Sequence, residues 1–152
     1  SWKERQSAIS SIDGAVVKAK PFGFHGPYLD VQCGELWPAL KVRLKDSNKN
    51  LVLQVLGLLS RLVAAVGPPV EKHCKPLLPG VLSLMADSKK PIRDSVLECL
   101  NVWVTCVPPE AIVKHLPAAL AVDAPAGRED ITRWTADFLQ SVDADRDLDL
   151  SA

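Results

Sequence analysis

The strongest constraint on this sequence is an internal repeat with a period of 41 residues. A shift of 41 positions places Pro38 on Pro79 and the polar segment 46–49 on the similar segment 87–90. Apolar residues at helical spacing flank both polar segments. A period of about 40 residues, built from two amphipathic helices around a polar turn, is typical of HEAT-type helical repeats. We therefore predict an all-α fold, a HEAT-repeat solenoid of stacked helix pairs.

The repeat predicts four units, of which the first and the last are incomplete. The units are placed at residues 1–18, 34–67, 70–107 and 109–142. The first unit begins at a turn and supplies only a second helix, and an irregular segment rich in Gly and Pro follows it. The acidic residues 143–152 are expected to begin a further repeat. The solenoid is therefore expected to be incomplete at both ends.

The second helices of the two central units carry the clearest pattern. In the first of these units, a helix over residues 49–66 is predicted, and Gly67 stands where a helix C-cap is expected. In the next unit, Asp87 and Ser88 are N-cap candidates for a helix over residues 91–106.

Charge and composition restrict the environment and the partners of the chain. Residues 1–93 hold 14 Lys and Arg against 7 Asp and Glu, whereas residues 94–152 hold 4 against 11, so charges of +7 and −7 cancel. A basic half favours an acidic partner. No stretch approaches the roughly 18 apolar residues of a membrane span, and no signal-peptide pattern opens the chain, so we expect no membrane association. The four cysteines, without close pairing, predict reduced, buried thiols in a cytosolic protein.

No group of residues suggests catalysis or metal binding. His73 and Cys74 form one possible ligand pair, but no second pair stands at the spacing of a zinc site. The serines have no evident His or Asp partners. We therefore expect no enzyme activity, no cofactor and no metal.

The turns within the repeats are the better candidate site, because equivalent turns of a solenoid align along one edge. An aromatic and a row of polar or basic residues fall on these turns. They are Trp2, Lys3, Asn48, Lys49, Lys89, Lys90, Arg93 and Arg128. Cations at turns are also common simply as solvated residues. Trp2 precedes the apolar stripe of its helix and should be exposed, as interface anchors often are, whereas Trp37, Trp103 and Trp134 fall on apolar stripes and are predicted to be core residues.

Several segments resemble a TOG domain. The segment Asp46–Val52 is the most specific, supported by Trp2–Arg5, Ala64–Pro68, and Asp87–Lys90 with Arg93. The sequence is most similar to the fourth TOG domain of the microtubule polymerase family that includes ch-TOG, Mini spindles and the plant protein MICROTUBULE ORGANIZATION. The resemblance covers residues 1–142, which would form a partial TOG domain of about three and a half repeats.

This resemblance implies binding of the αβ-tubulin dimer through the intra-repeat turns. Trp2 would take the role of the aromatic that packs on β-tubulin, and Lys49, Lys89, Lys90, Arg93 and Arg128 the roles of the basic residues. The resemblance also implies a monomeric domain of a cytoplasmic protein found on microtubules, on the spindle and at microtubule plus ends.

Two other functions stay open. A general HEAT scaffold, of the importin or phosphatase-subunit kind, would bind partners through its second helices, so exposed aromatics and charges should gather there. Nucleic-acid binding would require cations along a groove with interleaved aromatics, and only a single row is evident, so we expect no nucleic-acid partner.

Overall fold

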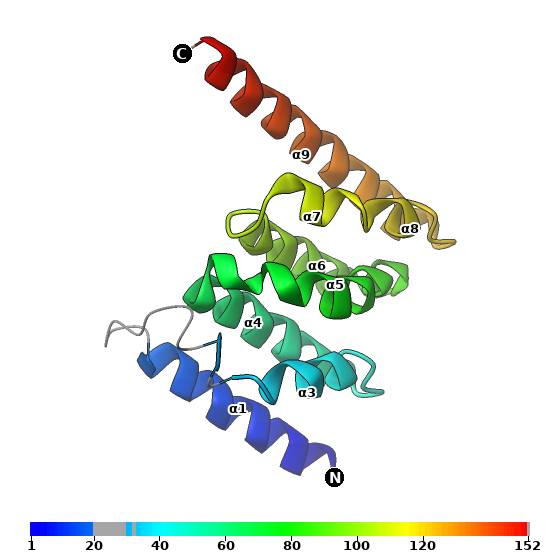
Figure 1. Cartoon of the computed structure of the whole chain (residues 1–152). Helices are drawn as coiled ribbons and strands as arrows, with labels where there is room; N and C mark the ends of the chain where they lie inside the picture. The colour runs from blue at the N-terminus through cyan, green and yellow to red at the C-terminus, as the bar shows by residue number, and fades with distance from the viewer. Residues whose placement is uncertain (20–29, 32, 152) are drawn as a thin grey trace.

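The computed structural model describes residues 1–19, 30–31 and 33–151, so the predicted irregular segment lies mostly outside the described part of the chain. Every regular element in these ranges is a helix (Figure 1), which confirms the predicted all-α fold. The α-helices are α1 (Trp2–Ala19), α3 (Leu36–Arg43), α4 (Lys49–Val66), α5 (Cys74–Ser83), α6 (Lys90–Trp103), α7 (Pro109–Val113), α8 (Leu116–Leu120) and α9 (Pro125–Ser151). Two 3-10 helices, η2 (Pro68–His73) and η3 (Leu84–Ala86), flank α5.

The helices form two layers, as a HEAT-type solenoid requires. Helices α1, α4, α6 and α9 follow one another in one layer, with α4 packed between α1 and α6. Helices α3, α5, α7 and α8 form the other layer (Figure 1). The structure thus agrees with the predicted stack of helix pairs. Helix α4 has the predicted bounds, and α6 begins and ends slightly before the predicted helix.

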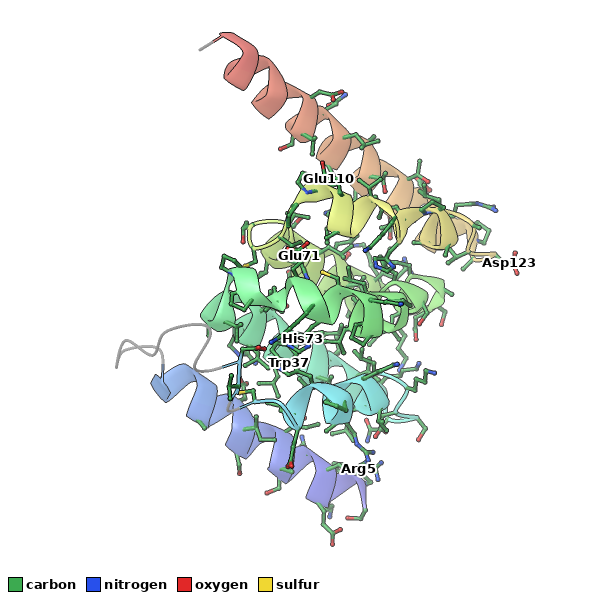
Figure 2. All side chains as sticks on the ribbon, in the orientation of Figure 1. Arg5, Trp37, Glu71, His73, Glu110 and Asp123 are labelled. Atoms are coloured by element: carbon green, nitrogen blue, oxygen red, sulfur yellow. The ribbon has the colours of Figure 1, made fainter. Side chains whose placement is uncertain are left out.

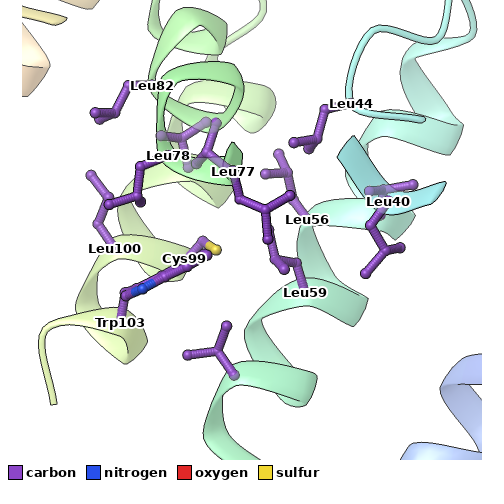
Figure 3. Packing of buried hydrophobic residues seen from close by; sticks show 14 of the residues in the cluster. Leu40, Leu44, Leu56, Leu59, Leu77, Leu78, Leu82, Cys99, Leu100 and Trp103 are labelled. Carbon is purple, nitrogen blue, oxygen red and sulfur yellow. The ribbon is translucent and has the colours of Figure 1, made fainter. Parts of the chain in front are cut away.

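The core lies between the two layers and depends mainly on Leu and Val (Figure 3). Helix α4 buries nine side chains, at positions that recur every three or four residues along its face. Leu56 and Leu59 of α4 lie near Leu77 of α5 in this core. Each fully buried leucine contributes about 2 kcal/mol through removal of apolar surface from water. Packing of these faces therefore provides the driving force for stacking.

Helix α4 is long and apolar enough to span a membrane by length and composition, in contrast to the sequence expectation. Half of its 18 residues are buried within the protein. The central helix of a two-layer stack needs such an apolar composition, because neighbours cover it on several sides. Its hydropathy is therefore explained by the fold.

Two glycines are required by the local backbone. Gly67 has a φ of 75° and ends α4, as the sequence predicts, while its N–H donates to the Val63 carbonyl at 2.8 Å. At Gly127, an added Cβ would lie 1.7 Å from the Met85 carbonyl oxygen. The first turn of α9 can therefore approach η3 only because residue 127 has no side chain.

The C-terminal segment and one tryptophan differ from prediction. Residues 143–151 continue α9 and do not begin a new element. Trp37 and Trp103 are buried, as predicted, but Trp134 is only half-buried. The Trp134 ring stacks on Phe138 at 5.2 Å between centroids, and its Nε1 donates to Asn101 Oδ1 at 2.8 Å. Trp134 lies at the outer boundary of the core because α9 contacts the stack mainly through its first turns (Figure 1).

The four cysteines are free thiols. Cys74 and Cys99 are buried, as predicted, whereas Cys33 and Cys106 are half-buried. Burial raises the pKa of the Cys99 thiol to about 11, so this thiol stays protonated at neutral pH.

Candidate protein-binding edge

The turns within the helix pairs lie on one side of the stack, together with the start of α1 (Figure 1). We call this side the turn edge and define it by residues 1–3, 44–49, 86–90 and 121–128. Two of its turns are built in the same way. Asp46 Oδ1 accepts from the Asn48 N–H at 2.9 Å, and Asp87 Oδ1 accepts from the Lys89 N–H at 2.8 Å. Each aspartate thereby fixes the backbone two residues ahead and starts the next helix.

Trp2 lies at one end of the turn edge and is 46% exposed, as the sequence predicts. Among the aromatic side chains that the structure describes, it is the one classed as exposed. Lys3 is also exposed, and its Nζ lies 5.8 Å from the centroid of the Trp2 ring. An aromatic surface with a neighbouring cation is typical of contact sites for proteins.

Three predicted cations reach solvent along the same edge. Lys89 and Arg128 are exposed, and Lys90 forms an exposed ion pair with Asp94 at 2.8 Å. A pair this exposed contributes little to stability and is readily exchanged for other partners. Lys45, in the turn before α4, is exposed as well and adds a cation.

Asn48 and Lys49 have structural partners. The Asn48 side chain caps α4 by accepting from the Asn50 N–H at 3.0 Å. Lys49 Nζ lies 2.8 Å from Asp87 Oδ2, so the start of α4 is joined to the turn of the following unit. The two residues shape the edge, and about two fifths of the Lys49 side chain stays exposed (39%).

Arg93 differs most from the predicted row of surface cations, because it is only 7% exposed. Its Nε donates to Asp130 Oδ2 at 3.0 Å, and one of its terminal nitrogens donates to the carbonyls of Asp87 and Ser88 at 3.0 and 3.1 Å. The guanidinium thus binds the turn before α6 and the helix α9. Its position in α6, one turn inside the helix, points it to the neighbouring unit and away from solvent.

The two turn aspartates are held as carboxylates. For Asp46, the hydrogen bond from the Asn48 amide and the contact with Arg5 outweigh the opposing effect of burial and lower its pKa. For Asp87, the hydrogen bond from Lys49 is the largest cause of a lowered pKa. Both acids are nearly buried and therefore depend on these partners.

Sequence reasoning missed a cluster where α3 packs near η2 (Figure 2). The rings of Trp37 and His73 stack at 4.1 Å, and His73 Nε2 lies 2.7 Å from the buried Asp30. Asp30 also pairs with Lys72. Burial acts to raise the pKa of Asp30, but the bonds from Lys72 and His73 outweigh it and lower the pKa. Asp30 and His73 are 43 residues apart, so no local pattern signals their contact.

The possible metal pair of the sequence is occupied by other contacts. His73 bonds to Asp30, while Cys74 Sγ accepts from the Trp103 Nε1 at 3.1 Å. Within the described ranges, no three His, Cys, Asp or Glu side chains are grouped as metal ligands. A hollow of about 570 Å³ lies between α5 and α8, and alanine is the commonest residue in its lining.

The two-layer stack of helix pairs is consistent with a HEAT-type repeat protein, and an exposed tryptophan and exposed cations lie along one edge of its turns. No family model matches the chain. Over 88% of its length it is 34% identical to Protein MOR1 of Oryza sativa subsp. japonica and 33% identical to Centrosomal protein 224 of Dictyostelium discoideum. Over 91% of its length it is 26% identical to Protein mini spindles of Drosophila melanogaster. The chain belongs to this TOG-domain microtubule polymerase family, and it spans 6% of the length of each of these relatives.

Proposed function

We propose that this chain is a tubulin-binding segment of a microtubule-associated protein, and that the turn edge contacts the αβ-tubulin dimer. The proposal places the protein in the cytoplasm, on microtubules and the spindle, with plus ends as the site of polymerase activity. Membership of the TOG-domain family supports a microtubule-associated role. We also propose a role in binding without enzyme activity, and a correspondence to the fourth TOG domain.

The observation that carries the proposal is the exposure of Trp2 beside exposed cations on one edge. Lys3, Lys89, Lys90 and Arg128 all reach solvent there, while Lys49 and Arg93 are bound to acids of the neighbouring units. A desolvated tryptophan contributes through contact, and solvated cations accelerate encounter with an acidic surface. The edge therefore suits a large acidic protein partner.

The alternative of a scaffold that binds through its second helices has less support. The other described aromatics, Trp37, Trp103, Trp134 and Phe138, are buried or half-buried, and the exposed ring of Trp2 lies at the first residue of α1, on the turn edge. The exposed ring of Trp2 and the exposed cations on the turns favour the edge as the interface.

Titration of the whole chain with free tubulin dimer tests the proposal. The replacement Trp2→Ala is expected to weaken binding by about 2 kcal/mol, or about 30-fold in Kd, mainly through faster dissociation. Adding Lys89→Glu and Arg128→Glu should slow association and reduce its dependence on salt, because exposed charges are screened within about 10 Å at 0.1 M salt.

The matched control carries the same charge reversals away from the turn edge, at the exposed residues Lys75 and Lys114. This control should bind tubulin far more tightly than the triple variant of the turn edge. Equal binding by the wild type and the turn-edge triple variant would exclude the edge as the interface.

A further inference from the structure

Three ion pairs join successive units at or beside the turn edge. Arg5 of α1 bonds to Asp46 at 2.9 Å, Lys49 of α4 pairs with Asp87 at 2.8 Å, and Arg93 of α6 bonds to Asp130 of α9 at 3.0 Å. Each pair links a second helix to the next unit, across a separation of 37 to 41 residues. We call them the cross-repeat pairs. The same connection thus recurs at every junction between the described second helices.

The acids of the first two pairs have a second role in their own turns. Asp46 and Asp87 each accept a backbone N–H of the residue two positions ahead. Arg93 adds a bond to the carbonyls of Asp87 and Ser88. The turn at residues 87–88 is consequently held by Lys49 from the unit before it and by Arg93 from its own unit. Arg93 in turn reaches α9, so the position of one turn is coupled to the next.

Burial distinguishes these pairs from the ordinary surface pairs. The side chains of Asp46 and Asp87 are 3% and 9% exposed, and that of Arg93 is 9% exposed. In the pair Lys90–Asp94, by contrast, both side chains are mostly or half exposed. A nearly buried acid needs its cation, because an unpaired charge there is costly, whereas a solvated pair can separate freely.

We propose that the cross-repeat pairs set the spacing of successive turns, so that Lys49 and Arg93 are positioning residues of the binding edge. Contact with the partner then falls to the free cations Lys89 and Arg128 and to Trp2. This assignment rests on the proposed binding of tubulin. A rigid edge with a fixed spacing loses less freedom on binding than a stack whose units slide.

The replacement Asp87→Asn distinguishes a positioning role of Lys49 from direct contact of Lys49 with tubulin, because the two roles predict opposite changes in tubulin affinity. Asparagine keeps the acceptor for the Lys89 N–H but leaves Lys49 without its carboxylate. If Lys49 contacts tubulin directly, its release and the lost negative charge tighten binding. If Lys49 positions the turns, the replacement weakens binding, by roughly fivefold for the loss of preorganisation.

Asp94→Asn is the matched control, because it removes the same charge from the same helix end and frees Lys90 from an exposed pair. We expect it to bind tubulin at least as tightly as the wild type. Lys49→Arg, which keeps the cation, should bind like the wild type, and Lys49→Met should weaken binding. Binding by Asp87→Asn that is equal to or tighter than wild type would overturn the positioning role.

Hydrogen exchange of the free chain tests the positioning role without any partner. In Lys49→Met, the Lys89 amide keeps its Asp87 acceptor but loses the clamp on that acid, so its exchange should accelerate roughly fivefold or more through local opening. Unchanged exchange in Lys49→Met would overturn the positioning role. If the wild type fails to bind tubulin but this exchange accelerates, the proposed function is wrong, whereas Lys49 still holds the turn at residues 87–89 in place.

Discussion

The turn between α3 and α4 and the turn between α5 and α6 share sequence and backbone geometry, but their lysines have different partners. Asp46 and Asp87 occupy equivalent positions and make the same bond to a backbone amide. The equivalent lysines diverge, since Lys49 pairs with the acid of the next unit and Lys90 pairs with Asp94 of its own helix. The repeated turn motif therefore gives both turns the same backbone structure. Whether the lysine of a turn is held in a cross-repeat pair depends on the acids of the neighbouring unit.

The close contact of Gly127 in α9 with η3, next to the turn between α5 and α6, should have the largest effect on stability when it is disturbed. Gly127→Ala places a Cβ against the Met85 carbonyl, so α9 must move away from η3 and from Arg93. We expect a loss of about 3 kcal/mol in the free energy of unfolding, measured by urea titration. The turn at residues 46–49 should keep its hydrogen-exchange protection, because α9 does not reach it.

Gly14→Ala is the control for this replacement. Gly14 lies within α1, and an added Cβ meets nothing within 4 Å. Alanine should stabilise this helix by up to about 1 kcal/mol. A Gly127→Ala variant as stable as the wild type would mean that the approach of α9 to η3 is not needed.

The two arginines of the cross-repeat pairs provide the next comparison. Arg93→Met should cost about 2 to 3 kcal/mol, because it leaves Asp130 and two carbonyls without their donor. Arg5→Met should cost about 1 kcal/mol, because about a third of Arg5 is exposed and solvent screens its pair. Lys90→Met should change stability by less than about 0.5 kcal/mol. A larger loss for Arg5 than for Arg93 would contradict the order that burial predicts.

Replacement of the turn aspartates separates the backbone bond from the ion pair. Asp46→Ala removes both, whereas Asp46→Asn keeps the acceptor for the Asn48 amide, so we expect alanine to be less stable by about 1 kcal/mol. At Asp87 the corresponding difference should be similar, because both variants lose the ion pair to Lys49 and only asparagine keeps the acceptor for the Lys89 amide. Thermal unfolding of the four variants measures the two differences.

The smallest expected effect concerns pH. Asp46 and Asp87 both have pKa values below the ordinary 3.8, so the unfolded chain binds more protons than the folded chain in acid. Their stabilising effect is complete above pH 3.8 and is lost as the pH falls through their folded pKa values. The unfolding free energy of the wild type should therefore decrease as the solution is acidified in this range.

The two turns should differ in how strongly their cations affect the slope of the unfolding free energy against pH. Lys49→Met should reduce the slope clearly, because the bond from Lys49 is the largest cause of the lowered pKa of Asp87. Arg5→Met should reduce it less, because the Asn48 amide is the largest cause at Asp46. Urea titrations at several pH values below 4 measure the slope in each variant. Equal slopes in Lys49→Met and Arg5→Met would contradict the expected order.

The sequence alone determined the stacked helix pairs and the exposure of Trp2. The apolar stripe of α4 and the C-cap at Gly67 are local patterns, and together with the 41-residue period they predicted the helix over residues 49–66 and its end correctly. Local patterns suffice here because helix formation and amphipathic packing depend on residues three or four positions apart. The row of candidate residues on the turn edge was found in the same way.

Only the tertiary structure decided which of those residues are free. The partners of Lys49 and Arg93 lie 38 and 37 residues away, and the contact of His73 with Asp30 spans 43. Such pairs arise when stacking brings two units together, so a basic residue in a turn motif has no local signal of its partner. Burial then decides which cations are available to a partner. Arg93 is desolvated and must pair with its acid, whereas Lys89 and Arg128 stay solvated and can bind another protein.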